Sequence, residues 1–418
     1  MRDIVVTLMV LIGCIYTIKR PYVGVLLWSW LSYMNPHRLC YGFAYGMPFA
    51  YITAVFLLIS FFFTKDKNRF PVNPLTVTWV LFILFMGLTT IFAYFPDQAS
   101  NDFIRTIKIQ FISILTVILI NDKDKLKQLI WVIVVSLGFF SIKGGLFTIL
   151  TGGSHRVWGP EGSFIEENNS LAVAILMVIP LMIFLSQISR YHLIKKGLLL
   201  GGLLSLFTVL GSQSRGALIA ISVVGFFYWL KSNRKIISGA VIVVMATILL
   251  NFMPDSWYRR MNTIETYEED GSAMGRINAW EYAFNAANHN LLGMGFNSWS
   301  YETFAQYAPN PSDVHAAHSI YFGVMADHGW IGLLLFLGIF ILSWRKLSNL
   351  VKKTRNDNEH QDLHILGKMM QVSFLAYLSG GAFLSLSYFD LPWHLVSITL
   401  IVERIIDFDK IKLQSAMV

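Results

Sequence analysis

Long apolar segments, separated by short polar ones, follow each other along almost the whole chain. A membrane-spanning helix needs roughly 20 mainly apolar residues. Apolar segments of about this length begin near Tyr51, Pro74, Phe103, Leu129, Leu171, Gly197, Gly216, Ile236, Ser319 and Met369. Shorter apolar segments occupy residues 4–18, 23–34 and 391–402. The pattern predicts an all-α polytopic membrane protein with about 12 transmembrane helices.

One polar segment, residues 252–317, is far longer than the others. It separates N-terminal transmembrane helices over 1–251 from C-terminal transmembrane helices and a short tail over 318–418. Connections of this length are usually functional or disordered. Aromatic residues such as Trp257, Trp280 and Trp299 favour an ordered loop with short helices, and we expect it to cover a cavity that faces outward.

Composition and charge indicate a membrane location and not a nucleic-acid partner. Hydrophobic residues make up 55% of the chain and charged residues 14%, whereas soluble domains contain about 25% charged residues. The 33 Lys and Arg residues outnumber the 25 Asp and Glu residues and give a net charge of +8. Most basic residues lie in short loops, which is typical of membrane-protein orientation signals. Cys14 and Cys40 lack metal-ligand spacing, and a disulfide between them stays open.

Basic loops orient the predicted helices. Loops rich in Lys and Arg face the cytoplasm, and five such loops alternate with the predicted helices, at residues 65–69, 123–127, 190–196, 231–235 and 345–355. The segments between them, at residues 94–102, 151–169, 211–215 and 252–317, would face outward. Strict alternation places the N-terminus outside, whereas it lies inside if the first two apolar segments form one broken span.

A histidine at the start of a predicted membrane helix is the strongest candidate for chemistry. His318 lies in the sequence His-Ala-Ala-His-Ser-Ile-Tyr, residues 315–321, at the outer end of the helix. Histidine in such a position can act as a general base near neutral pH. Two other interpretations are an interfacial histidine that bonds a backbone carbonyl, and a metal site formed by His318 with Asp313 and His315. No strong further ligand pattern follows, so we expect no metal.

Two arginines are candidates for binding a phosphate group. Arg215 follows a tight polar turn, residues 211–214, and precedes an apolar segment. Its guanidinium can bind phosphate through two hydrogen bonds, and the N-terminus of the following helix adds free N–H groups. The alternative is an arginine that only marks the end of a span. Arg276 precedes Trp280 by four residues, so the two share a helix face, and a cation–π contact is the simpler explanation of this pair.

Weaker candidates lie on the same outer side of the predicted helices. They are polar or ionisable residues near apolar segments, for which pairing within the structure is the alternative explanation. This group comprises Lys143, Arg156, Glu166, Asn169, His315 and Asp390.

The order of these features resembles the bacterial O-antigen ligase and polymerase superfamily. The resemblance rests on the arginine turn at 214–217, the long loop with Arg276 and Trp280, and residues 318–321 followed by Gly329. It extends over nearly the whole chain.

Three further stretches resemble one branch of this superfamily, the putative O-glycosylation ligases found beside exosortase-type sorting systems. They are residues 28–38, 156–160 and 267–270. Asp327 departs from the superfamily pattern, in which a Glu precedes the glycine turn, but it keeps a carboxylate.

The resemblance implies a fold, a reaction and roles for three residues. The fold would be a GT-C-like helical bundle in the bacterial inner membrane, with residues 252–317 as a periplasmic loop and the tail in the cytoplasm. The donor would be a saccharide on undecaprenyl pyrophosphate, and the acceptor the core sugar of lipid A or a related acceptor. Transfer would be inverting and would need no metal or cofactor. His318 would deprotonate the acceptor hydroxyl, while Arg215 and Arg276 would hold the pyrophosphate.

Other functions fit parts of the same pattern. An O-antigen polymerase would use the same three residues, and an O-linked protein glycosylation ligase would differ only in its acceptor. A transporter of lipid-linked saccharides would favour ionisable residues at the bilayer midplane and repeated, broken helices. The candidates here gather at one side of the membrane, so a ligase is the preferred interpretation.

Overall fold

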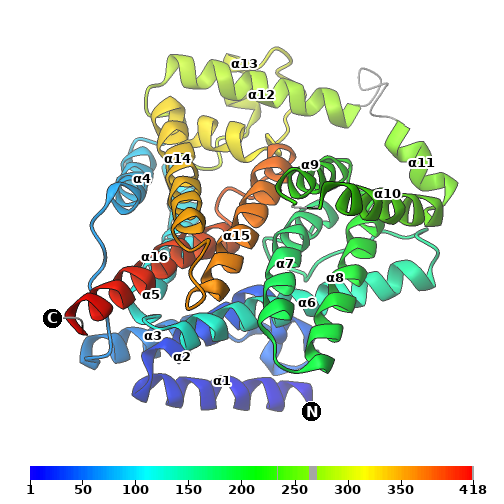
Figure 1. Ribbon diagram of the computed structural model, residues 1–418. Helices are drawn as coiled ribbons and strands as arrows, with labels where there is room; N and C mark the ends of the chain where they lie inside the picture. The colour runs from blue at the N-terminus through cyan, green and yellow to red at the C-terminus, as the bar shows by residue number, and fades with distance from the viewer. Residues whose placement is uncertain (233, 263–270, 417–418) are drawn as a thin grey trace.

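The computed structural model describes residues 1–232, 234–262 and 271–416 (Figure 1). Within these residues the chain forms sixteen α-helices and three 3₁₀-helices, and it forms no strand. Residues 267–270, one of the stretches that resemble the ligase branch, lie outside the described residues.

The helices follow the apolar pattern of the sequence. The first elements are α1 (Arg2–Lys19), α2 (Pro21–Met34), η1 (Pro36–Leu39), η2 (Phe43–Gly46), α3 (Phe49–Phe63), α4 (Pro74–Ile91) and α5 (Pro96–Leu119). The central elements are α6 (Lys123–Leu150), α7 (Asn168–Ile188), α8 (His192–Gly211), α9 (Arg215–Lys231) and α10 (Lys235–Phe252). The last elements are α11 (Asp255–Asn262), α12 (Gly271–His289), α13 (Tyr301–Tyr307), α14 (Ile320–Lys353), α15 (Gln361–Gly380), η3 (Gly381–Phe383) and α16 (Asp390–Ala416).

Six of the described helices are long and apolar enough to cross a membrane, namely α4, α6, α7, α8, α10 and α14. Two further apolar helices, Phe49–Phe63 and Arg215–Leu230, are shorter. The prediction of an all-α polytopic membrane protein is therefore confirmed. The sequence-based figure of about 12 spans also counts helices that are short, such as α2 with 14 residues, or that carry several charged residues, such as α5 and α16.

α7 forms the centre of the helical bundle. Of the 18-residue apolar stretch of α7 that could cross a membrane, 78% is buried within the protein, and the helix packs against α6, α8, α9 and α15. α10 is the opposite case, since only 11% of its 18-residue apolar stretch is buried. α10 therefore leaves most of its apolar surface to the surroundings.

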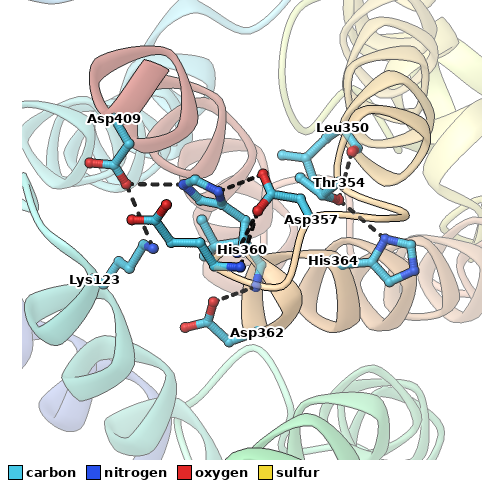
Figure 2. A network of polar contacts seen from close by, with 10 residues as sticks. Lys123, Leu350, Thr354, Asp357, His360, Asp362, His364 and Asp409 are labelled. Carbon is cyan, nitrogen blue, oxygen red and sulfur yellow. Dashed lines mark hydrogen bonds and ion pairs between the residues drawn. The ribbon is translucent and has the colours of Figure 1, made fainter. Parts of the chain in front are cut away.

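Polar contacts join the basic loops of the sequence at one face of the bundle, which we call the basic face. Lys125 Nζ lies 2.8 Å from Asp66 Oδ2, and Lys127 Nζ lies 3.3 Å from Asp362 Oδ2. Figure 2 shows the centre of this network, where the imidazole of His360 lies between the carboxylates of Asp357 and Asp409, at 2.8 and 3.1 Å. Two of the five basic loops, residues 65–69 and 123–127, thus meet in space, next to the start of α15.

The N-terminus lies at the opposite face. α1 and α2 are separate helices. The Asp3 carboxylate at the start of α1 accepts hydrogen bonds from the backbone N–H groups of Gly42 and Ala44, in the connection between α2 and α3. The start of that connection borders a cavity together with residues 162–165, a segment that the sequence places outside. The N-terminus and residues 162–165 therefore both lie beside this connection.

α14 is bent near its beginning. Gly329 breaks the helix with φ of 62° and ψ of −168°. The backbone N–H groups of Met294 and Gly295 donate to the carbonyls of Ala326 and Asp327, both at 2.9 Å. Gly293 comes so close that a methyl group on it would lie 2.4 Å from the nitrogen of Gly329. The segment after α12 is thus fastened to the bent membrane helix by its backbone.

Candidate functional site

The arginine turn connects α8 to α9 and is held by the connection that precedes α7. The side-chain amide of Asn168 donates to the carbonyl of Ser212 at 2.6 Å, and Gln213 donates to the carbonyl of Gly153 at 3.2 Å. The backbone N–H of Val157 donates to the carbonyl of Gly211 at 3.1 Å. These contacts fix the turn from one side.

Arg215 is the first residue of α9. Ser214 caps this helix, because its hydroxyl accepts from the backbone N–H of Ala217 at 3.1 Å. Arg215 is half-buried and lies at a helix start, where the helix dipole is positive and favours anions. Gly216 packs closely, since a methyl group on it would lie 3.1 Å from Cβ of Phe383 in η3.

α12 carries Arg276 and holds the segment that leads to His318. The side-chain amide of Asn278 donates to the carbonyls of Asn310 and Asp313 at 2.9 Å each, and its oxygen accepts from the Asn310 N–H at 2.9 Å. Gly275 faces the ring of His315, because a methyl group on Gly275 would lie 2.9 Å from Nδ1 of that ring. In Figure 1, α12 lies across the end of the bundle above the start of α14.

Trp280 is the contact that connects these parts. Its indole N–H donates to the carbonyl of Ala317 at 2.7 Å, directly before His318. The ring stacks on Phe322 of α14 at 5.0 Å and contacts Phe383 at 6.4 Å. Phe383 also packs against Gly216, so α12, the start of α14 and the start of α9 all meet around Trp280. We call the face that holds Arg215, Arg276 and His318 the site face.

His318 stands directly before α14, whose N-cap is Ser319. The backbone of His318 has φ of 43°, in the left-handed region that costs most residues free energy. Such strain at a non-glycine residue is found mainly where the surrounding structure imposes it, often at functional sites. The side chain is half-buried.

Burial and neighbouring charge lower the pKa of His318 below its ordinary value of 6.5. Desolvation is the largest cause, the positive charge of Arg276 is the next, and the nearby charge of Glu167 opposes both by raising the pKa. The neutral imidazole is therefore the dominant form near neutral pH, as a general base requires. The charges of Arg276 and Glu167 therefore act on His318 in opposite directions.

The remaining residues predicted from the sequence lie in different surroundings. The Glu166 carboxylate accepts from the backbone N–H of Gly162 at 2.8 Å and closes its own loop. Arg156 is exposed, and Asn169 is half-buried in the first turn of α7. Lys143 is exposed on α6, and the two glycines that follow it face α8.

His315 and Asp390 have partners or neighbours of their own. His315 is exposed, and its Nδ1 lies 2.8 Å from Oδ1 of Asp313. Within the described parts of the chain, no three His, Cys, Asp or Glu side chains come together as a metal-binding group. Asp390 is buried at the start of α16 and borders a separate cavity of about 230 Å³ with Arg105 and Phe164. Neither arginine of the turn and loop, nor His318, lines that cavity.

Several residues of this region were not singled out from the sequence. Asn168 adjoins Asn169, and only the fold shows that Asn168 binds the arginine turn through the Ser212 carbonyl, whereas Glu166 binds its own loop. Asn278 is two residues from Arg276, but its three hydrogen bonds join positions more than thirty residues apart. Such contacts leave no signal in a single sequence.

A buried polar cluster lies at the bend of α14. The Tyr388 hydroxyl lies 2.9 Å from both Asp327 Oδ2 and His328 Nε2, and Thr89 Oγ1 lies 2.7 Å from His328 Nδ1. Asp327 and His328 are both buried. The carboxylate that replaces the expected Glu is therefore bound internally at the bend and not directed toward solvent.

Comparison with known families divides the chain into two matched regions. Residues 1–190 match a family of unknown function (DUF5935), and residues 200–337 match the O-antigen ligase family. Arg215, Arg276 and His318 all lie in the second region, whereas Glu167 and Asn168 lie in the first. No curated protein matches the chain.

Proposed function

Because the chain belongs to the O-antigen ligase superfamily through residues 200–337, we propose that it transfers a saccharide from undecaprenyl pyrophosphate to the core sugar of lipid A or a related acceptor. The family indicates a glycosyl-transferring membrane enzyme. The donor, the acceptor, the location in the bacterial inner membrane and the orientation of the site face toward the periplasm belong to our proposal. So do the three-part division of the chain at residues 251 and 317 and the assignment to the exosortase-associated branch.

The proposed reaction is a displacement at the anomeric carbon of the donor sugar. His318 takes the proton of the acceptor hydroxyl, whose oxygen then forms a bond to the anomeric carbon from the face opposite the leaving group. The bond from this carbon to the pyrophosphate oxygen breaks, and undecaprenyl pyrophosphate leaves with the electron pair. The configuration at the carbon is inverted, and no redox change or external energy source is needed.

Arg215 and Arg276 would bind the pyrophosphate and stabilise the negative charge that develops on it. Fixed positive charges in a site with little water act more strongly than the same charges in bulk water. The helix start at Arg215 adds the dipole of α9 to this effect. A pyrophosphate is a good leaving group, so positioning, a base and positive charge suffice for the reaction, and we propose that no metal takes part.

The observation that supports the proposal most strongly is that α12, the start of α14 and the start of α9 meet around Trp280; these are the elements that carry or adjoin Arg276, His318 and Arg215. The lowered pKa of His318 beside the charge of Arg276 agrees with this role. An imidazole that is kept neutral beside a cation suits a base whose substrate carries a neighbouring pyrophosphate. The weaker candidates have smaller roles in this proposal. Glu166 and Asn169 would shape the rim of the site, and we assign no step to Lys143, Arg156, His315 or Asp390.

The test is transfer by the purified full-length protein from a polyprenyl-pyrophosphate-linked glycan to lipid A–core, without added metal or nucleotide. We expect His318→Ala to lower the rate by roughly 10²–10⁴-fold, as removal of a general base does. Arg215→Ala should lower it by roughly 10²–10³-fold. Matched controls are His289→Ala and Arg259→Ala, which change exposed residues of α12 and α11.

The outcome also separates the alternatives. Lengthening of the donor glycan would identify a polymerase, and transfer to a protein acceptor would identify an O-linked protein glycosylation ligase. Full activity of His318→Ala would refute the proposed base. Movement of the intact lipid-linked saccharide across vesicles, without transfer, would identify a transporter.

A further inference from the structure

A cavity lies at the basic face, at the far end of the helices that begin at the site face. It has a volume of about 650 Å³ and lies between the ends of α7, α9 and α14 and the first half of α15. α7, α9 and α14 each start near the arginine turn or His318 and end at this cavity. α7, with 21 residues, separates the two by about 30 Å. The cavity is therefore a different place from the proposed active site.

The wall of this cavity is positively charged. Lys352, Arg355 and Lys368 line it, and no Asp or Glu side chain does among the described residues. Polar groups such as Gln187 and Gln371 complete the lining. A wall with several cations and no carboxylate attracts anions.

The nearby carboxylates are engaged elsewhere. Asp357 pairs with His360, Asp362 with Lys127, Asp409 with Lys123 and His360, and Glu403 with Lys346. Figure 2 shows part of this network, with the carboxylates of Asp357 and Asp409 on either side of the His360 ring. Within the described part of the chain, none of the three cavity cations lies within ion-pair distance of a carboxylate. The fold thus supplies counter-charges around the cavity but not inside it.

A second cavity continues from the first into the apolar interior. It has a volume of about 500 Å³, lies between α7, α8, α9, α10 and α15, and is lined almost entirely by apolar side chains such as Ile179, Leu218 and Met245. Tyr228, Met369 and Val372 line both cavities. A charged mouth therefore adjoins an apolar chamber between membrane helices. α10, which buries little of its surface against the protein, forms one wall of the chamber through Val241, Ile242 and Met245.

We infer that these two cavities together form a binding site for an anionic membrane lipid. The phosphate of the headgroup lies among Lys352, Arg355 and Lys368, and an acyl chain extends past Tyr228 into the chamber beside α9 and α10. A Lys or Arg near a membrane surface attracts anionic lipid with about 1 kcal/mol per residue. The apolar chamber selects a lipid over free phosphate or a nucleotide, because only a lipid fills both parts. The headgroup part of this site lies away from the proposed active site, whereas the chamber extends to Leu210 and Leu218 beside the arginine turn.

The test measures lipid retention by the full-length protein. The protein is reconstituted in nanodiscs of phosphatidylcholine with added phosphatidylglycerol, extracted, and examined by native mass spectrometry for the lipid that stays bound. The triple variant Lys352→Gln, Arg355→Gln, Lys368→Gln should lower the apparent affinity for phosphatidylglycerol at least roughly tenfold. The matched control neutralises three exposed cations of the same face outside the cavity, Arg190, Lys195 and Lys196.

Two further variants test the apolar chamber. Gly225 lines it, and a methyl group on Gly225 would lie 4.0 Å from its nearest neighbour, Ile242, so Gly225→Leu directs a side chain into open space. Leucine favours a helix over glycine, so folding should be kept. Gly202→Leu is the control, because a methyl group on Gly202 would have nothing within 4 Å and this residue does not line the chamber.

We expect Gly225→Leu to lower phosphatidylglycerol retention and Gly202→Leu to leave it unchanged. Equal losses in the cavity triple variant and in the control triple variant would overturn the inference, since surface charge alone would explain the binding. Release of phosphatidylglycerol by millimolar inorganic phosphate, with equal protection against thermal unfolding by phosphate alone, would assign the cavity to a free anion and would also overturn it.

Discussion

Trp280 provides the sharpest test of how the site face is held together. Its indole N–H donates to the Ala317 carbonyl at 2.7 Å and its ring stacks on Phe322 at 5.0 Å with an interplanar angle of 9°. Trp280→Phe removes the hydrogen bond and keeps a ring in place. A hydrogen bond of this kind contributes about 0.5–1.5 kcal/mol, so the segment before α14 should open about fivefold more often. Trp280→Ala also loses the stacked ring and should cost about 3 kcal/mol, the low end for a large aromatic residue because Trp280 is half-buried.

Amide hydrogen exchange measures these openings directly, since local unfolding exposes the amides of one segment at a time. The amides of residues 314–320 should exchange about fivefold faster in Trp280→Phe and by a larger factor in Trp280→Ala. Trp299→Phe is the matched control, because the ring of Trp299 packs on Tyr282 at 5.1 Å and on Phe304 at 6.3 Å, and both of these residues lie outside segment 314–320. Transfer activity should fall together with the protection, since the His318 position follows from that of Ala317.

An unchanged exchange rate in Trp280→Phe would refute the reasoning, because the hydrogen bond would then not hold the segment. Equal rates in Trp280→Phe and Trp280→Ala would assign the whole effect to the indole N–H and none to stacking. Faster exchange in Trp299→Phe at residues 314–320 would show that any loss of a tryptophan in this part loosens the segment.

Three further changes test single contacts. Glu167→Gln removes the charge that raises the pKa of His318, so this pKa should fall further. Activity is lost as the pH drops through this pKa, and this acid limb of the pH–rate profile should therefore move to lower pH. An acid limb that stays in place would show that it does not report on His318. Asn168→Ala leaves the buried Ser212 carbonyl without its 2.6 Å partner, so thermal unfolding should show a loss of about 1–3 kcal/mol in stability. The KM for the saccharide donor should rise, and a KM equal to that of the wild type would contradict the role of this contact. Asn278→Ala removes three hydrogen bonds to the loop before His318 and should lower the free energy of unfolding by about 3 kcal/mol, with faster amide exchange in residues 310–313. Asn285→Ala in the same helix removes one hydrogen bond and should lower it by about a third as much.

The helical architecture and the two faces could be predicted from the sequence, because both depend on local patterns. Apolar length sets which segments can form membrane helices, and the alternation of basic loops sets their direction. The contact between Lys125 and Asp66 joins two loops that the charge pattern had already placed together. The number of membrane-spanning helices was less predictable. α2 is shorter than the roughly 20 residues of a typical span, and α16 carries several charged residues, so length and hydropathy do not decide whether these helices cross the membrane.

The surroundings of the candidate site could not be predicted in the same way. The sequence indicates Arg215, Arg276 and His318 as candidates, but their roles stay predictions. That Trp280 contacts Ala317, and that Glu167 lies near His318, follows from packing between helices far apart in the chain. A single sequence carries no record of such pairs. Asp390 illustrates the same limit, since its burial in a separate cavity depends on the positions of α2, α5 and α16.

The backbone clasp between residues 293–295 and the bend of α14 determines which parts of this protein can be exchanged with those of a relative. Met294 and Gly295 donate to carbonyls inside the membrane helix, and Gly293 and Gly329 touch with no room for a side chain. A chimaera joined at residue 317 would take the N–H groups of this clasp from one parent and the carbonyl groups that they bind from the other. An isolated outer segment would lose its acceptors altogether. Swaps of specificity should therefore transplant residues 252–332 as one unit, with the bend included.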